Sequence, residues 1–596
     1  MEPEIITVLI ILVATVVLLI FEIVRIDIVA LVCMLALGWT GILTPQEALS
    51  GFSSNAVIAM MAVMILGQGI AKTGIMDHFS RAVLKKAGVS RKRIIGLMSL
   101  SVGILSGFIQ NIGAAALFLP GILNISRRGK IPASALIMPI GFAAILGGTL
   151  SMVGSGPLIL LNDLLRNAAL EPYGLFSVTP AGLLLLLFGI GFFLLFGKFV
   201  LPYSESSNKI VSEQEKLIKA LHLPFNIWHY MVSPNSPLIG KTTEQSGVWD
   251  TFKLNILGLS RGRDVEYAPW RETKFEAGQE IALLGNEQDV KKFAFAFNLE
   301  LEERPGRFAS LNDPETSGFA EVIIPPRSEM IGQTIRKHSL RKRHAVEPVL
   351  LFSKGEEIRG DFSDHMVIPG DTIIVYGLWD KINDLKSSAN FVVATPFVME
   401  KKYPSKTWVA LLCFAAALGL ALAGYSISMA FFTGAIAMVL TRILDIQEAY
   451  QSIEWKVVFL LAGLIPLGVA MQKTGTAAFL AGQMMTLVQG EHPLFLVFTV
   501  AVLSTLFSLF MTNVGAIVVL APLVINMAQM GGFDPRPLAL MAAVCSANSF
   551  VLPTHQVNAL LMSAGGYRNA DYVKAGGGMT LLFILIVVTV FYLFYL

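Results

Sequence analysis

Hydrophobic residues along this chain form long uninterrupted runs, and a more polar stretch separates two groups of them. Runs near the length that crosses about 30 Å of hydrocarbon predict about ten membrane spans. They lie near residues 4–21, 27–43, 55–72, 134–161, 181–202, 407–424, 428–441, 456–471, 537–563 and 577–596. Two further apolar stretches, 94–126 and 493–528, are too short for two full crossings, so each is predicted to form a re-entrant hairpin.

Basic residues on both sides of the first hairpin predict how the chain is oriented. The cations before and after it are Arg81, Lys85, Lys86, Arg91, Lys92 and Arg93, then Arg127, Arg128 and Lys130. Because cytoplasmic loops carry an excess of Lys and Arg, both ends of this hairpin should face the cytoplasm. Counting spans outward puts residues 204–406, which Lys401, Lys402 and Lys406 follow, in the cytoplasm and both termini outside. We therefore expect a multi-pass protein of the cell inner (plasma) membrane.

The two groups of apolar runs repeat one another. Residues 46–48, 72–74 and 106–114 match residues 447–449, 473–475 and 508–516, at separations of 401, 401 and 402. By the same count the second hairpin enters from the external side, opposite to the first. This pattern predicts an inverted-topology repeat, which secondary transporters use to alternate access around a site at the membrane midplane.

Polar residues and helix breakers occur at membrane depth in four places, where they are costly unless they bind partners or line a cavity. Two are the hairpin tips, and two are breaks within residues 147–157 and 546–558. An interrupted helix exposes carbonyl groups that suit a sodium ion and N–H groups that suit an anion. The candidate substrate-binding residues are Gln110, Asn111, Gly113, Thr149, Ser155, Thr512, Asn513, Gly515, Ser549, Thr554 and His555.

The four segments contain no Lys or Arg, so an anion there would be held by helix dipoles, amides and hydroxyls. They also contain no Asp or Glu, which argues against a carboxylate-based proton antiporter. His555 is their single titratable group. It would either contact substrate or carry a proton, or it is a neutral histidine bonded to a neighbouring carbonyl.

Composition supports the membrane class and excludes others. The chain has 596 residues, 54% of them hydrophobic and 15% charged, with a mean hydropathy of +0.66, which is too apolar for a soluble protein of this length. A net charge of +3 gives no reason to expect nucleic acid. Cys33, Cys413 and Cys545 lie in apolar runs without metal-ligand spacing. Without a nucleophile and base arrangement, the chain is not predicted to be an enzyme.

At the hairpins and breaks the chain resembles the divalent anion/sodium symporter (DASS) family of the ion transporter superfamily, across residues 1–203 and 407–596. The hairpin tips of that family carry Ser-Asn-Thr motifs, which here read Gln110-Asn111-Ile112 and Thr512-Asn513-Val514. Both asparagines are kept. The hydroxyl positions that would hold dicarboxylate oxygens are largely replaced, so sulfate or another sulfur oxyanion is expected ahead of a dicarboxylate.

The resemblance also implies how ions are bound and moved. It implies one sodium site formed by Asn111 with the Gly154 turn, and another formed by Asn513 with the break at Ala547 and Thr554. Sodium ions would be the coupling ions, and no organic cofactor is expected. The family further implies homodimers in which a scaffold supports an elevator-like transport domain.

The polar stretch contains two copies of one pattern of short strands and turns, as in a small α/β module. Residues 234–242 and 277–285 of the first copy match residues 326–334 and 369–377 of the second. Each copy resembles the C-terminal module of potassium-conductance regulators (TrkA-C, also called RCK-C), which implies dimerisation and ligand sensing. The insert has no Gly-x-Gly-x-x-Gly motif, so it lacks the nucleotide-binding half of those regulators. Its basic run, residues 336–344, would bind a small anionic ligand or the membrane surface, or form a solvated face.

The sequence therefore predicts an α-helical polytopic membrane protein with two inverted repeats, re-entrant hairpins and two small α/β cytoplasmic domains. The expected boundaries are 1–203 and 401–596 for the repeats, and 204–304 and 305–400 for the TrkA-C-like domains. The predicted function is sodium-coupled symport of a small anion by an elevator mechanism. The alternatives are a cation or oxyanion antiporter of the same superfamily and a ligand-gated ion channel.

Overall fold

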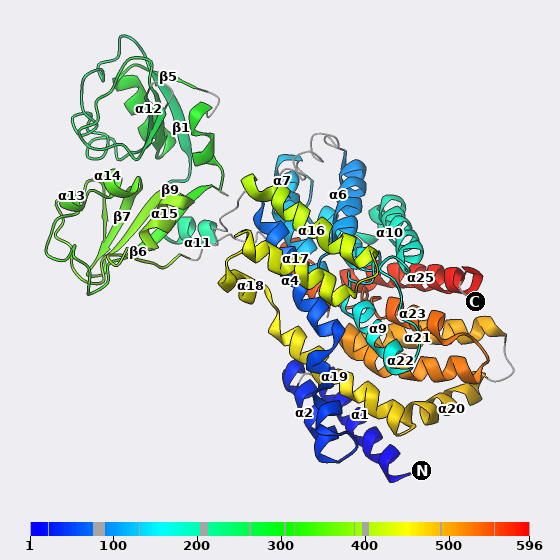
Figure 1. Cartoon of the computed structure of the whole chain (residues 1–596). Coiled ribbons are helices and arrows are strands. Elements are labelled where there is room, and N and C mark those ends of the chain that lie inside the picture. The colour runs from blue at the N-terminus through cyan, green and yellow to red at the C-terminus, as the bar shows by residue number, and fades with distance from the viewer. Residues whose placement is uncertain are drawn as a thin grey trace. The chain divides into compact units, whose positions relative to one another are not determined.

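The chain forms two compact units in the computed structural model (Figure 1). One unit combines Met1–Asn208 with Lys401–Leu596 and is called the membrane unit here; the other, Lys209–Glu400, is the insert. The structure describes residues 2–21, 23–75, 90–129, 131–202, 213–261, 264–302, 306–314, 316–386, 388–395, 404–488, 492–553 and 555–594. The candidate site residue Thr554 and the orienting cations Arg81, Lys85, Lys86, Lys130, Lys401 and Lys402 lie outside these ranges.

The membrane unit is helical, and its two halves follow the same order of elements. The first half contains α1 (Pro3–Phe21), α2 (Ile26–Trp39), α3 (Pro45–Leu49), η1 (Ser50–Ser53), α4 (Asn55–Lys72), α6 (Arg91–Ser106), α7 (Asn111–Gly129), α8 (Ser134–Gly147), α9 (Gly156–Asn167) and α10 (Thr179–Val200). The second half contains η3 (Pro404–Lys406), α16 (Thr407–Leu422), α17 (Ile427–Leu440), α18 (Ile446–Ser452), α19 (Trp455–Lys473), α20 (Thr476–Val488), α21 (Pro493–Phe510), α22 (Asn513–Met530), α23 (Pro535–Cys545), α24 (Gln556–Gly565) and α25 (Asn569–Phe594).

Seven of the described helices are long and apolar enough to cross a membrane, which makes this a mostly helical multi-pass membrane protein. Five of them, within α1, α3–α4, α10, α19 and α25, fall in predicted spans. Other predicted spans hold shorter helices, such as α2, α16 and α17, or are divided in two. The remaining two long helices, α21 and α22, are the arms of the second predicted hairpin, each of 18 residues. Length alone therefore does not separate that hairpin from a pair of crossings.

Matching capping signals show why corresponding helices begin at corresponding residues. Thr44 forms a capping box with Glu47 at the start of α3, and Asp445 forms one with Glu448 at the start of α18. In each box the side chain of the first residue accepts a hydrogen bond from the helix, and the glutamate accepts one from the backbone of the first residue. The equivalent boxes lie 401 residues apart, as the sequence repeat requires.

Several helices of one half pack closely against helices of the other. Blue α2 lies along yellow α19, and α4 lies along α17 (Figure 1). Glycines permit these close approaches, because a Cβ on Gly51 would overlap the carbonyl group of Ala462 and one on Gly463 would overlap the backbone of Ala30. The two halves are therefore interlocked rather than side by side.

The insert contains two five-stranded antiparallel sheets, as two copies of a small α/β module predict. The first module has α11 (Glu213–Ala220), β1 (Ile227–Val232), β2 (Asn255–Arg261), β3 (Asp264–Tyr267), β4 (Glu280–Leu284), α12 (Glu287–Ala296) and β5 (Leu299–Leu301). The second has η2 (Gly306–Asn312), β6 (Ser317–Ile323), α13 (Ile335–His338), α14 (Leu340–His344), β7 (Glu347–Ser353), β8 (Glu356–Arg359), β9 (Thr372–Leu378), α15 (Trp379–Lys386) and β10 (Val392–Val393). The strand orders, β3-β2-β4-β1-β5 and β8-β7-β9-β6-β10, are equivalent.

Candidate functional site

The tip of the first hairpin is held by a buried serine and asparagine. α6 ends at Ser106 and α7 begins at Asn111. The Ser106 hydroxyl lies 2.8 Å from Asn111 Oδ1 and 2.7 Å from the carbonyl oxygen of Ala144, in the last turn of α8. A Cβ on Gly148 would lie 2.5 Å from Asn111 Oδ1, so this amide rests on the start of the first break. The tip thus gathers neutral oxygens at the end of an interrupted helix.

The tip of the second hairpin repeats this arrangement. The Ser508 hydroxyl lies 3.0 Å from Asn513 Oδ1 and 2.5 Å from the carbonyl oxygen of Ser546, where α23 has just ended. The hydroxyl of Ser549 adds a second contact to Asn513 Oδ1, at 2.9 Å. In both hairpins a serine five residues before the asparagine joins it to the carbonyl end of the facing half-helix. Carbonyl ends of this kind are where broken helices of transporters coordinate sodium.

The first break contains one hydroxyl that is hydrogen-bonded and one that has no partner in the structure. The hydroxyl of Thr149 donates to the carbonyl oxygen of Leu146 at 2.6 Å and is fully buried. Gly154 is closely approached by the carbonyl oxygens of Gly148 and Gly107, which would lie 2.6 and 3.0 Å from a Cβ at that position. The hydroxyl of Ser155, just before α9, is buried and has no hydrogen-bond partner in the structure. An unpaired hydroxyl at a helix N-terminus is suited to a ligand oxygen.

The second break is held by buried amides. Ala547 and Ser549 are almost fully buried, and the backbone N–H of Ser549 donates to the carbonyl oxygen of Ala547 at 2.9 Å. The Asn558 amide donates to the carbonyl oxygen of Ser549 at 2.8 Å. Asn548 lies between the hydroxyls of Thr505 and Thr580, at 3.2 and 2.9 Å. These contacts fix the interrupted backbone in one conformation.

Two further candidates serve as helix caps. Thr512 is the N-cap of α22, and its hydroxyl accepts a hydrogen bond from the backbone N–H of Gly515 at 3.1 Å. His555 is the N-cap of α24, and its Nδ1 accepts from the N–H of Val557 at 3.2 Å. Accepting this bond requires an unprotonated Nδ1. The capping contact agrees with the second interpretation of His555, a neutral histidine bonded to nearby backbone, although the partner is an N–H and not a carbonyl.

The two glycines of the tips differ in their surroundings. A Cβ on Gly113 would meet no atom within 4 Å, whereas one on Gly515 would lie 3.1 Å from the hydroxyl of Thr512. The start of α9 adjoins the second tip, since a Cβ on Gly156 would lie 3.1 Å from a methyl group of Val514. The first break and the second hairpin tip are therefore neighbours.

Sequence reasoning missed three residues that contact these candidates. Ser106 and Ser508 belong to the repeated run and share the same spacing to their asparagines, so the repeat itself was the available signal. Glu454, just before α19, is hydrogen-bonded through its carboxylate to the side chain of Gln110. The hairpins and breaks contain no carboxylate of their own, but Glu454, from the second half of the chain, places its carboxylate beside Gln110 at the first tip.

The paired hairpins, the two broken helices and the apolar spans are features of a secondary transporter. The profile of the family described as Citrate transporter (CitMHS) matches residues 16–545 and 487–596, and the chain belongs to this family of transporters, which are not enzymes. It is 29% identical to the uncharacterized transporter YfbS of Escherichia coli (strain K12), over 98% of both chains. It is 28% identical to an uncharacterized transporter of Synechocystis, over 94% of this chain and 92% of that one. A probable sodium/sulfate cotransporter 3 of Chlamydomonas reinhardtii is 23% identical over 56% of this chain and 38% of its own length.

Proposed function

We propose that this protein is a sodium-coupled symporter of a small anion, with sulfate or another sulfur oxyanion favoured over a dicarboxylate. The observation that carries the proposal is the repeated contact of Ser106 with Asn111 and of Ser508 with Asn513, each beside the carbonyl end of a broken helix. The name of the Chlamydomonas relative, a sodium/sulfate cotransporter, supports both the ion and the anion.

Two sodium sites follow from the two tips in this proposal. Asn111 and the turn at Gly154 form one, and Asn513 with the break at Ala547 and Thr554 forms the other. Each offers amide and carbonyl oxygens and no charged side chain, which is the ligand set that sodium meets in broken transporter helices. The anion lies between the tips, where the N-terminus of α9 and the unpaired Ser155 hydroxyl would interact with its negative charge.

In this proposal the two halves have opposite orientation in the inner membrane, with the insert in the cytoplasm and both termini outside. α6–α7 and α21–α22 enter as hairpins from opposite faces. The hairpins and broken helices form a transport domain that moves against a scaffold formed by the first spans of each half, in an elevator mechanism. Two chains form the homodimer.

Uptake of radiolabelled sulfate into proteoliposomes tests the coupling. An inward sodium gradient should drive accumulation, and replacing sodium by potassium or choline should abolish it. Uptake that persists without sodium would refute symport, and a current that rises without saturation would favour the channel alternative.

Asn111→Ala and Asn513→Ala should each weaken the sodium dependence. Asn526→Ala is the matched control, because this asparagine of α22 donates to the carbonyl oxygen of Pro522, one turn earlier in the same helix, at 2.8 Å.

The antiporter alternative has one specific observation in its favour, the contact between Glu454 and Gln110. A carboxylate beside the first hairpin tip is a candidate proton carrier. Glu454→Gln keeps the size and one hydrogen bond but removes the charge. Under symport this variant retains sodium-driven uptake, whereas under proton antiport it loses the response to an imposed pH gradient.

The insert regulates transport in this proposal, through a small ligand. Arg336 and Arg341 of the basic run are bonded to carboxylates within the insert, which leaves a cavity as the better candidate. This cavity of about 450 Å³ is lined by Gln214, Ile218, Phe225, Asn226, Ile227, Trp228, Leu311, Asn312, Pro314, Ser317, Gly318, Phe319 and Tyr376. The buried indole N–H of Trp228 has no hydrogen-bond partner. In vesicles supplied with cell extract, Trp228→Leu should differ from the unmodified protein in sodium-driven uptake. In vesicles without extract the two proteins should take up the anion equally. The same uptake by both proteins under both conditions would contradict a ligand in this cavity.

A further inference from the structure

Matching strands and turns of the two modules of the insert recur at a separation of 92 residues. Left-handed backbone conformations, which few residues adopt, recur at that separation in five pairs. These pairs are Gly240 with Gly332, Gly247 with Ser339, Lys253 with Ala345, Ala268 with Gly360, and Gly278 with Gly370. The same β-bulge follows Ile256 in β2 and Pro348 in β7. Residues that lie 92 positions apart are therefore equivalent in the two modules.

Several equivalent residues touch one another where the modules meet. The carboxylate of Glu244 lies 3.0 Å from the guanidinium of Arg336, its counterpart 92 residues later. The guanidinium of Arg341 lies over the ring of its counterpart Trp249, 4.4 Å from the ring centre. Arg271 donates a hydrogen bond to the hydroxyl of its counterpart Ser363. Contacts between equivalent positions are what a local two-fold axis produces.

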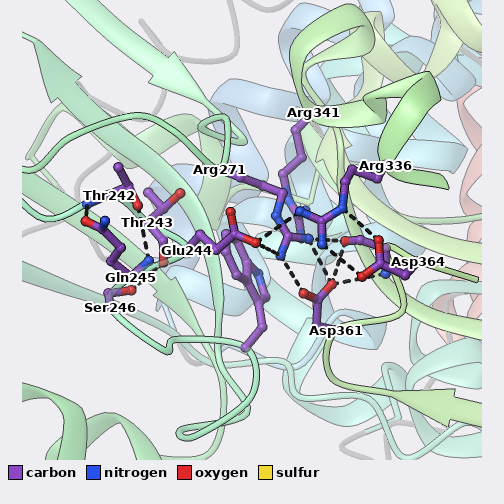
Figure 2. A network of polar contacts seen from close by, with 12 residues as sticks. Thr242, Thr243, Glu244, Gln245, Ser246, Arg271, Arg336, Arg341, Asp361 and Asp364 are labelled. Carbon is purple, nitrogen blue, oxygen red and sulfur yellow. Dashed lines mark hydrogen bonds and ion pairs between the residues drawn. The ribbon is translucent and has the colours of Figure 1, made fainter. Parts of the chain in front are cut away.

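A network of charges surrounds this axis (Figure 2). Arg271 is 3% exposed and forms two hydrogen bonds, at 3.0 and 2.6 Å, with the carboxylate of Asp361 in the second module. It also bonds Glu244 at 2.7 Å, so Glu244 lies between Arg271 and Arg336. Trp249 donates to the carboxylate of the almost fully buried Glu347 at 3.1 Å.

Beside the network the two sheets share one apolar core. Leu257, Ala282 and Leu284 of the first module lie in it together with their equivalents Val349, Ile374 and Tyr376. The segment that joins the modules is part of the same core, since Phe308 and Leu311 of η2 are buried there. The carbonyl oxygen of Leu311 accepts hydrogen bonds from Tyr376 at 2.6 Å and from Ser317 at 2.8 Å. The connection is thus packed inside the pair that it joins.

Pairing of like modules would destroy these contacts. Two first modules paired about this axis would set Glu244 against Glu244 and Arg271 against Arg271. Two second modules would set Arg336 against Arg336 and Arg341 against Arg341. Each module would keep its internal pairs, Arg271 with Glu244 or Arg336 with Asp364. The bonds between modules, from Arg271 to Asp361 and from Arg336 to Glu244, would be lost, so the unlike pair is better matched in charge. The residue differences between the two modules at these equivalent positions therefore favour pairing of a first module with a second module.

We propose that the two modules pair with each other within one chain, and that unlike residues at equivalent axis positions close this surface to a second chain. Pairing of modules about this axis would then contribute nothing to the proposed homodimer. The proposal does not depend on which ion or anion is carried.

Cross-linking of the full-length chain tests this assignment. In a background with Cys33, Cys413 and Cys545 replaced by alanine, we would introduce Glu244→Cys and Arg336→Cys, singly and together, and treat with a short bismaleimide. The doubly substituted chain should form a link within one chain, identified as a joined pair of proteolytic peptides. Neither single variant, nor a co-expressed mixture of the two carrying different tags, should yield linked dimers.

Linked dimers from either single variant would show pairing of like modules and overturn the proposal. Linked dimers from the mixture would show exchange of modules between chains and overturn it as well, as would absence of the internal link. Because both substitutions remove a member of the network, a second pair, Glu244→Cys with Asp364→Cys, leaves Arg336 in place. Glu244 and Asp364 both bond Arg336, at 3.0 and 2.7 Å, so their side chains lie within reach of the same reagent.

Discussion

The ammonium group of Lys473 lies 2.8 Å from the carboxylate of Glu47, and the residues related to them by the repeat, Lys72 and Glu448, form the same ion pair in exchanged roles. Each lysine is the last residue of a helix of one half, α4 or α19, and each glutamate closes the capping box of the other half. The two pairs differ in burial, because the Lys72 side chain is 7% exposed and that of Lys473 is 45% exposed. Matched variants can therefore separate burial from geometry.

Glu448→Gln should destabilise the membrane unit more than Glu47→Gln. Removing the carboxylate beside buried Lys72 should cost about 2 kcal/mol, since a desolvated charge loses its counter-charge. Removing the carboxylate beside exposed Lys473 should cost much less, because solvent screens an exposed ion pair. Thermal unfolding of the two variants in the same detergent gives the comparison. Equal midpoints would show that burial of Lys72 does not matter.

Ser508→Ala should weaken activation of uptake by sodium, because it removes the hydroxyl that joins Asn513 to the carbonyl group of Ser546. We expect the sodium concentration for half-maximal uptake to rise by about tenfold, which corresponds to about 1.4 kcal/mol. Ser504→Ala is the matched control, since this buried serine lies one turn earlier in α21 and its hydroxyl has no partner in the structure. An equal effect of both variants would point to packing in α21.

Gly148→Ala should reproduce the defect of Asn111→Ala. The added methyl group would lie 2.5 Å from Asn111 Oδ1 and would displace the amide from the first tip. Gly191→Ala, in α10, provides the comparison, because its methyl group would meet no atom within 4 Å. Sodium titrations of uptake should place Gly148→Ala with the asparagine variant and Gly191→Ala near the unmodified protein. The reverse order would contradict the geometry of the first tip.

His555→Asn should leave the pH profile of uptake unchanged. Asparagine is a favoured N-cap and can replace Nδ1 as acceptor for the N–H of Val557. His555→Ala should instead cost about 1 kcal/mol of stability through loss of the cap. If His555 carries the coupling proton, His555→Asn will abolish the pH dependence of uptake although the cap is retained.

The insert should lose stability in acid. Burial would raise the pKa of Asp361, but the hydrogen bonds from Arg271 and Ser363 outweigh it and hold this pKa below its ordinary value. For Glu244, burial is likewise outweighed by Arg271 and Arg336, and its pKa is lowered. A lowered pKa in the folded state gives stability that is complete above the unfolded value, near pH 4, and is lost as the pH falls through the folded value. The protection factors of insert peptides against hydrogen exchange should therefore fall as the pH decreases below about pH 4.

Substitution of Arg271 tests the same network at neutral pH. Arg271→Met leaves Asp361 without its main partner and should cost the insert about 3 kcal/mol. Lys291→Met, which removes an exposed pair with Glu287, should leave stability almost unchanged, because solvent screens that pair. Proteolytic susceptibility of the insert measures both. Similar protection of the two variants would show that the network contributes no stability.

The apolar runs and the repeat predicted the membrane class, the two-part organisation and the insert. These features depend on the composition and order of long segments, which can be read directly from this sequence. Local pattern could not show that Glu454 meets Gln110, since that contact is made between helices of different halves. Nor could it show that Thr512 and His555 act as caps, because capping depends on where a helix begins to within one residue. The asparagines were found because the repeat marks them twice, and their serines were visible in the same repeat.

The interlocking of α2 with α19 and of α4 with α17 has a consequence for how the protein is made. Neither half can bury its glycine-lined faces until the other has been synthesised, and the whole insert is translated between them. At usual rates of synthesis the first half therefore waits roughly 10 to 40 seconds in the membrane before its partner helices emerge. During that interval the unpaired contact faces of the first half are accessible to chaperones and to quality-control proteases. Prompt folding of the insert would shorten the unfolded segment between the two halves.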